Sequence, residues 1–298
     1  MWLARHLGLQ RDLALKVLHW RSHSREQVRL RFEREALAIG SLRHPNIVAA
    51  LDFGSLVDGR RFLAMEYIRG KTLAEICGHS GRLPWRVAVH VGVQAADALA
   101  YSHRRGVIHR DLKPENLIVE GGDAAHGRCL ILDLGLARIR DAVTHCGISD
   151  HTMAIGTPRY AAPEQFLGLS VDHRADIYGL SAVLYRLIAG RSPYDGWTFE
   201  EVAEKMQRTG VVPLDRACRD HSRPRQLDDL VMAGLARDPA RRPQSADVLS
   251  ESLRRTECTL GGEIARRRWP SSQRCAWGGA LFAVGAGIGA AGAALLGL

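Results

Sequence analysis

The sequence predicts an α+β fold with a small strand-rich N-terminal lobe and a larger helical C-terminal lobe. Residues 47–68 alternate between apolar and polar side chains, as a hairpin does, and Asp58-Gly59 is a turn signal between the two arms. Residues 84–106 instead repeat their apolar side chains with the period of a helix. An apolar fraction of 46% over 298 residues is ample for a buried core.

The N-terminal lobe is expected to contain further strands and one helix. Residues 2–7 and 13–18 read as two short strands joined by the link LGLQRD. Residues 25–41 place their apolar side chains on one face at helical spacing, which predicts an amphipathic helix. Pro45-Asn46 then favours a turn before the hairpin.

The C-terminal lobe is expected to be mainly helical. Pro84 lies near the first turn of the first long helix and Gly106 lies past its end, as helix termini prefer. Residues 176–190 are apolar nearly all round, so this second helix should be buried. Short strands, loops and further helices should follow to about residue 253.

Charge and cysteine usage narrow the classes of function. The formal net charge is +9, but no basic face is interleaved with aromatic residues, so nucleic-acid binding is not expected. The six cysteines form no CxxC pair and do not stand near histidines at zinc-ligand spacing. They are expected to be reduced thiols of a cytosolic protein.

The chemical signal comes from a set of short motifs. These are HRDLKPEN at 109–116, DLG at 133–135, APE at 162–164 and, earlier, Lys16 inside the apolar run LALKVL. In this order they resemble the protein-kinase family, and specifically bacterial serine/threonine kinases of eukaryotic type. The resemblance runs from residue 1 to about 253. It implies a two-lobed fold, with an N-lobe at 1–68, a C-lobe at 69–253 and ATP in the cleft between them.

The resemblance implies a role for each residue of the catalytic motifs. Asp111 would orient the substrate hydroxyl and accept its proton, and Lys113 would reach the transferring phosphate, as in serine/threonine kinases. Asn116 and Asp133 would be the ligands of Mg²⁺ or Mn²⁺, a hard cation that also keeps phosphate oxygens among its ligands. Phosphoryl transfer depends on this positioning and charge neutralisation more than on covalent chemistry.

Two further sets of residues match the ATP site by resemblance. Lys16 would hold the α- and β-phosphates and pair with a glutamate of the following helix, and the alignment of FEREALAIGSLRHPNIV selects Glu35. The second set should surround the adenine: Met65 as gatekeeper, the backbone carbonyl of Glu66, the backbone N–H of Ile68, and the apolar side chains Ala14 and Ile118.

The segment from Asp133 to Glu164 matches an activation loop. Arg110 could pair with a phosphate on this loop, and Ser149 and Thr152 are the candidate sites of autophosphorylation. By resemblance, three more residues have structural or regulatory roles. Thr157 would help to read the substrate, Glu164 would pair with Arg242, and Asp176 would hold the backbone of the catalytic loop.

The C-terminal end predicts a membrane anchor. Residues 254–274 look like a basic linker, and residues 275–298 carry no charge over a helical length of about 36 Å. The arginines before this segment place its N-terminal side in the cytoplasm, which implies a single pass through a bacterial inner membrane. A flexible low-complexity tail is the alternative. The spacing Gly285-x-x-x-Gly289 also suits helix pairing in a homodimer, although chance gives such matches in glycine-rich segments.

The start of the chain departs from the family pattern. The family has a glycine-rich loop before the strand of Lys16, but here WLARHLGLQRDLALKVL matches only the segment after that loop. Met1 then stands where the family has a valine, which predicts a natural start upstream. A pseudokinase that binds a partner with weak or no ATP turnover is the alternative function. A small-molecule phosphotransferase is disfavoured, because the activation segment serves protein substrates.

Overall fold

A computed structural model gives the fold of the chain. It describes residues 1–8, 10–21, 37–58, 60–78, 81–134, 158–167, 169–196, 198–218, 220 and 222–258. The backbone contacts divide the chain into two units, Met1–Leu260 and Gly261–Leu298. All described residues belong to the first unit.

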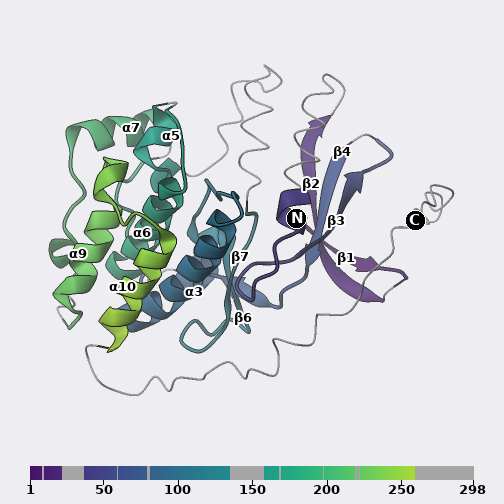
Figure 1. The fold of residues 1–298 in the computed structure, drawn as a ribbon. Helices are drawn as coiled ribbons and strands as arrows, with labels where there is room; N and C mark the ends of the chain where they lie inside the picture. The colour runs from purple at the N-terminus through teal and green to yellow at the C-terminus, as the bar shows by residue number, and fades with distance from the viewer. Residues whose placement is uncertain are drawn as a thin grey trace. The chain divides into compact units, whose positions relative to one another are not determined.

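The N-lobe is built on a four-stranded antiparallel sheet with the order β1-β2-β4-β3 (Figure 1). Its strands are β1 (Trp2–His6), β2 (Arg11–Arg21), β3 (Ala50–Ser55) and β4 (Arg60–Glu66). The two early strands and the hairpin predicted from alternation are therefore confirmed, with β2 longer than expected. Of the helix predicted at 25–41, only 37–41 is described, and residues 37–40 are helical.

The register of this sheet positions the lysine. Lys16 on β2 lies opposite Leu63 of β4, and Ala14 lies opposite Met65. Leu63 and Met65 are buried in an apolar cluster that also includes Val48. Lys16 thus extends from a strand whose neighbouring strand is fixed by the small core of the N-lobe.

The C-lobe begins with a three-stranded antiparallel sheet, ordered β5-β6-β7, and continues with helices. The strands are β5 (Gly70–Thr72), β6 (Leu117–Glu120) and β7 (Cys129–Ile131). The described helices are α2 (Leu73–Cys77), α3 (Trp85–His103), α5 (Pro163–Phe166), α6 (Arg174–Ala189), α7 (Phe199–Arg208), α8 (Leu214–Ala217), α9 (Arg225–Gly234) and α10 (Ala246–Cys258).

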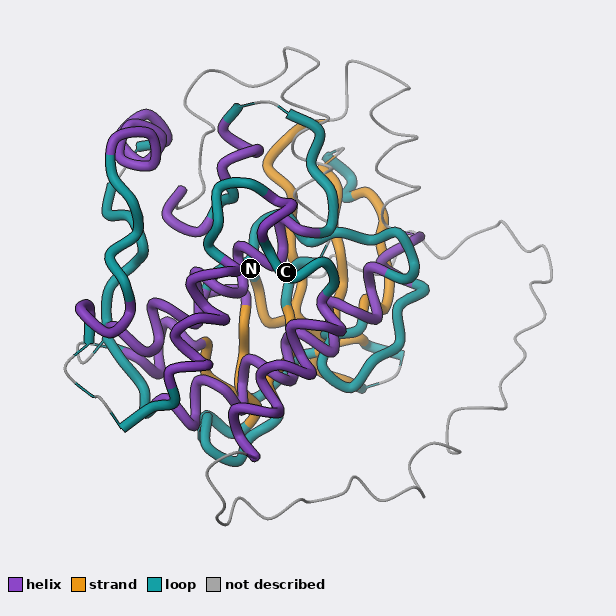
Figure 2. Tube along the Cα trace, turned by 60° about the vertical axis from the view of Figure 1, so that its left-hand side comes forward, coloured by secondary structure: helices purple, strands orange, loops and turns teal. Residues whose placement is uncertain are grey.

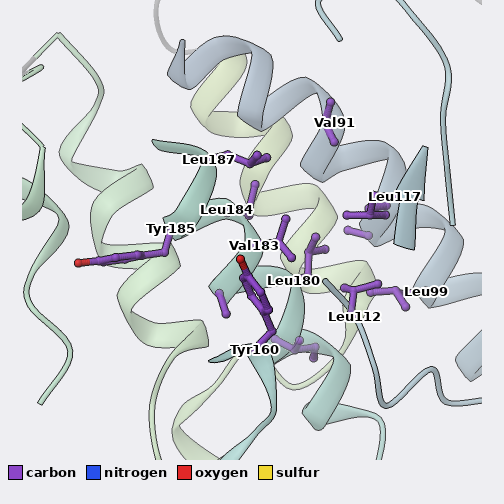
Figure 3. Close-up of a cluster of buried hydrophobic side chains, with 14 of the residues drawn as sticks. Val91, Leu99, Leu112, Leu117, Tyr160, Leu180, Val183, Leu184, Tyr185 and Leu187 are labelled. Atoms are coloured by element: carbon purple, nitrogen blue, oxygen red, sulfur yellow. The ribbon is translucent and has the colours of Figure 1, made fainter. Parts of the chain in front are cut away.

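Helix α6 lies at the centre of the C-lobe. Every residue from Ala175 to Tyr185 is buried, which confirms the prediction of a buried helix. Helix α3 packs against both α6 and α10. Figure 2 shows several helices lying close together in the described part of the chain. A Cβ atom at Gly92 of α3 would lie 2.8 Å from Leu184 Cδ2, so the glycine allows the two helices to approach closely. Figure 3 shows part of the core of this lobe, including Val91, Leu99, Leu112, Leu117, Leu180, Val183 and Leu187.

The last described helix reaches beyond the predicted end of the C-lobe pattern. Helix α10 continues to Cys258, so residues 254–258 of the expected basic linker are helical. Within the described ranges, no helix combines the length and apolar character needed to cross a membrane. The expected anchor at 275–298 lies outside those ranges.

Candidate active site

The catalytic loop is held in position by one carboxylate of the buried helix α6. Asp176 Oδ1 accepts a hydrogen bond from the backbone N–H of Arg110, and Oδ2 accepts one from the N–H of His109, both at 2.8 Å. His103 Nε2, at the end of α3, lies 2.8 Å from the same Oδ2. The loop therefore takes its position from the core of the C-lobe.

These contacts also set the charge of Asp176. Burial alone would raise its pKa, but the hydrogen bond from His103, the charge of His103 and the bond from the Arg110 N–H together hold the pKa below its ordinary value. Asp176 is therefore a carboxylate at neutral pH and can accept all three hydrogen bonds.

His109 adds a second support inside the loop. Its Nε2 lies 2.9 Å from the carbonyl of Leu132, and its Nδ1 accepts a hydrogen bond of 3.2 Å from the Asp111 N–H. A carbonyl only accepts, so Nε2 donates to Leu132 while Nδ1 serves as the acceptor for the Asp111 N–H. The buried ring thus links the catalytic loop to the residue before Asp133.

The candidate proton acceptor and its lysine lie side by side. Lys113 Nζ donates to Asp111 Oδ2 at 3.0 Å, and both side chains are only partly exposed, at 16% and 22%. Asn116, in the short 3-10 turn Pro114–Asn116, donates from Nδ2 to the backbone carbonyl of Asp111 at 2.7 Å. This bond directs the amide so that its oxygen remains for another ligand.

Asp133 lies next to this turn, since the N–H of the preceding residue, Leu132, donates to the carbonyl of Asn116 at 2.9 Å, and its carboxylate is only partly satisfied. Its Oδ2 forms an ion pair with Lys16 Nζ from the N-lobe. Its Oδ1 is buried and has no hydrogen-bond partner among the described residues. Asp133 also has a positive φ of 56°, a conformation that is uncommon outside glycine. A buried carboxylate oxygen without a donor is costly, so this atom is suited to a cation.

A Mg²⁺ or Mn²⁺ ion fits this donor set. The orphaned Asp133 oxygen and the Asn116 amide oxygen are hard ligands, and the turn at 114–116 holds Asn116 in place. In the described part of the chain no three His, Cys, Asp or Glu side chains gather into a metal cluster. Two protein ligands suit an ion that takes its remaining ligands from water and phosphate.

The residues expected around adenine share one apolar cluster. Met65 and Ile68 are buried in it, and Ala14 and Ile118 pack against it half-buried. Glu66 is the last residue of β4, and its N–H donates to the carbonyl of Ala49 at 2.9 Å. The cluster contains residues of both lobes, since Ile118 belongs to β6 and the other three to the N-lobe strands and the link after them.

The C-terminal end of the activation segment is anchored by a buried ion pair. Arg242 Nη1 and Nη2 donate to the two oxygens of Glu164 at 2.7 and 2.8 Å, and the Arg242 side chain is fully buried. The same guanidinium donates to the carbonyls of Arg174, Ala236 and Arg237. The structure thus brings Glu164 and Arg242 together with all five N–H donors of the guanidinium satisfied.

Comparison with known proteins decides the family. Residues 2–253 match the family model described as the protein kinase domain. The chain belongs to the protein kinase family. The kinase chain is 36% identical over 254 residues to serine/threonine-protein kinase pkn2 of Myxococcus xanthus, covering 85% of this chain and 30% of that protein. It is 35% identical over 255 residues to serine/threonine-protein kinase PknB of Mycobacterium leprae, covering 84% and 40%.

A solved structure agrees with this assignment. The kinase chain superposes on the crystal structure of the Mycobacterium tuberculosis PknI kinase domain with a TM-score of 0.64 and 30% identity, covering 85% of this chain and 89% of that one. The two-lobed kinase fold expected from the motifs is therefore confirmed. The kinase chain spans less than half of the length of the curated relatives named here.

Several predicted residues of the kinase chain cannot be placed. Glu35, the expected partner of Lys16, lies outside the described residues, as do Ser149, Thr152 and Thr157. Arg110 is described and half-buried, with a positive φ of 66°. Its expected phosphorylated partners belong to the part of the activation segment that is not described.

Sequence reasoning missed two polar residues of the site. His103 bonds Asp176, and its Nδ1 is buried without a partner among the residues that the structure describes. Gln165 donates to the carbonyl of Arg110 across a separation of 55 residues. The only signal for His103 was a polar residue in the last turn of an amphipathic helix, and Gln165 followed the APE motif without a pattern of its own.

Proposed function

We propose that this chain is an active, ATP-dependent serine/threonine protein kinase that transfers the γ-phosphate of ATP to hydroxyl groups of proteins. The observation that carries this proposal is the Asp111–Lys113 pair beside Asn116 and the orphaned oxygen of Asp133. Together these side chains provide a proton acceptor, a cation for the phosphate and two ligands for a divalent metal.

Each side chain has one task in this mechanism. Asp111 accepts the proton of the substrate hydroxyl, and Lys113 lies close enough to share its charge between Asp111 and the transferring phosphate. Asn116 and Asp133 would hold Mg²⁺ or Mn²⁺, which would neutralise phosphate charge when bound. Lys16 is an ion-pair partner of Asp133 and, in the proposal, turns to the α- and β-phosphates when ATP is present.

The remaining parts of the proposal concern regulation and location. Autophosphorylation at Ser149 or Thr152 would give Arg110 a phosphate partner. Residues 1–253 would form the kinase domain, followed by a basic linker at 254–274 and a membrane helix at 275–298 that keeps the domain on the cytoplasmic side of a bacterial inner membrane. A homodimer through that helix is a further part of this proposal.

A phosphotransfer assay tests the central proposal. The purified chain is incubated with radiolabelled ATP, Mg²⁺ and a generic protein substrate, beside Asp111→Asn and a metal-free sample. Label on serine or threonine that needs both Asp111 and the metal supports the proposal. Binding of ATP without any transfer would contradict it and favour the pseudokinase alternative.

Cell fractionation tests the location separately. The full chain should sediment with membranes, and a chain truncated after residue 270 should not, because it lacks the uncharged segment. Full-length protein in the soluble fraction would contradict the anchor without touching the proposed chemistry.

A further inference from the structure

The peptide immediately before Asp111 is held from two sides. Arg110 has a φ of 66°, and a non-glycine residue keeps such a conformation only where its surroundings enforce it. Asp176 of α6 holds the N–H of Arg110. Gln165 of α5 donates from Nε2 to the carbonyl of Arg110 at 2.8 Å. That carbonyl belongs to the peptide bond that leads into Asp111, so Gln165 contacts the group whose plane sets the direction of the aspartate.

The other end of the Gln165 side chain is also fixed. Its Oε1 accepts a hydrogen bond of 2.9 Å from the N–H of Ala162, at the start of α5. The reverse orientation of the amide would place oxygen against the Arg110 carbonyl and NH₂ against the Ala162 N–H, so the contacts define a single orientation. The preceding residue, Glu164, is locked to Arg242 in the core.

We infer that Gln165 is a positioning residue that transmits the position of helix α5 to Asp111. The two anchors of the Arg110 peptide differ in origin. Asp176 lies on the buried core helix, whereas Gln165 lies on the end of the activation segment. A displacement of α5 therefore acts on the peptide beside the proposed proton acceptor through one hydrogen bond. This inference rests on the proposed kinase function for its consequence, but its structural part does not.

Two substitutions separate this coupling from simple capping of α5. Gln165→Glu keeps the acceptor for the Ala162 N–H but loses the donor to Arg110. Gln165→Leu loses both. Gln207→Leu, on the exposed face of α7, is the matched control for a glutamine-to-leucine change.

Single-turnover phosphotransfer and amide hydrogen exchange give independent readouts. Both Gln165 variants should slow transfer about three- to tenfold, the effect of one lost hydrogen bond, while the KM for ATP stays within about twofold. Both should also speed amide exchange in a peptide covering 107–116, whether or not the wild-type chain turns over. Gln165→Leu should lower the melting temperature more than Gln165→Glu does, because it loses the cap on the Ala162 N–H as well as the bond to the Arg110 carbonyl.

Unchanged exchange at 107–116 in Gln165→Glu would overturn the inference, and so would an effect confined to Gln165→Leu. If the wild-type chain shows no transfer, the proposed function fails, but the exchange result still decides whether Gln165 holds the loop.

Discussion

Two residues of the active site have left-handed backbone conformations, and their surroundings differ. The N–H of Arg110 donates a hydrogen bond to Asp176, and its carbonyl accepts one from Gln165. Asp133, with a φ of 56°, has one oxygen on Lys16 and one buried oxygen with no partner among the described residues. The fold thus completes the catalytic loop by itself, but leaves Asp133 to be completed by a ligand. Strain at the first site is balanced by protein contacts, and at the second by binding.

The largest effect on phosphotransfer is expected from a substitution of Asp111, which the catalytic loop holds in the active site. Asp111→Asn should reduce phosphotransfer at least about 100-fold, because it removes the proposed proton acceptor. Its melting temperature should stay close to that of the wild type, since the supports of the loop act on backbone groups. Turnover near the wild-type rate would show that Asp111 is not the proton acceptor.

A second substitution removes the carboxylate of Asp176, which holds the backbone of the catalytic loop. Asp176→Asn should destabilise the protein by about 3 kcal/mol, because one buried acceptor oxygen that serves Arg110 or His109 is replaced by a donor. Urea unfolding followed by circular dichroism measures the change. A loss below about 1 kcal/mol would mean that the loop does not depend on this carboxylate.

The same substitution at Asp133 should change stability little without ligand but should remove stabilisation by MgATP. Asp133→Asn should cost less than about 1 kcal/mol without ligand, since it loses only a partly exposed ion pair and relieves an unpaired buried oxygen. It should also abolish the rise in melting temperature that MgATP gives the wild type. Equal stabilisation by MgATP in the variant and the wild type would show that Asp133 does not take part in binding MgATP.

Acid pH sharpens the comparison further. The pKa of Asp176 is lowered in the folded protein, so its contribution is fully present above the ordinary aspartate value near 3.9 and is lost as pH falls below it toward the folded pKa. The difference in unfolding free energy between wild type and Asp176→Asn should therefore be constant from pH 7 to about 5 and shrink below about pH 4. A difference that already shrinks between pH 7 and 6 would contradict the assignment of this stability to the Asp176 carboxylate.

The smallest expected effect is on the reactivity of the buried cysteine thiols. Burial raises the pKa of Cys129 to about 12, and Cys77 and Cys218 are buried too. Iodoacetamide at pH 8 should therefore leave these three unlabelled in the native chain and label them after unfolding in guanidinium, as mass spectrometry of peptides would show. Rapid native labelling of Cys129 would indicate that the region around β7 opens.

The parts predicted from the sequence are those whose signal is local. Strands β1 and β2 follow from short runs of apolar side chains, and helix α3 from its apolar periodicity and terminal residues. Helix α6 follows from a segment that is apolar nearly all round. The family motifs also selected the residues that now lie around Asp111 and Asp133. These motifs work because phosphoryl transfer needs particular side chains at fixed spacings.

The parts that were missed depend on long-range contacts. Nothing near Gln165 shows that its amide reaches a carbonyl 55 residues earlier, and nothing near Lys16 shows that it meets Asp133, 117 residues later. His103 looks like any polar residue at a helix end until α6 brings Asp176 beside it. A single sequence records the chemistry of such residues but not their partners.

Helix α6 has a consequence for how this protein can be engineered. Its N-terminal end carries Asp176, and its next turns carry Leu180, Val183 and Leu184 of the main core. A larger or smaller side chain at those positions shifts the helix, and with it the carboxylate under the catalytic loop. Stability and turnover are therefore not independent traits on this helix. Variants selected for heat resistance should accumulate on outer elements such as α7 and α9, while α6 tolerates little improvement of either property alone.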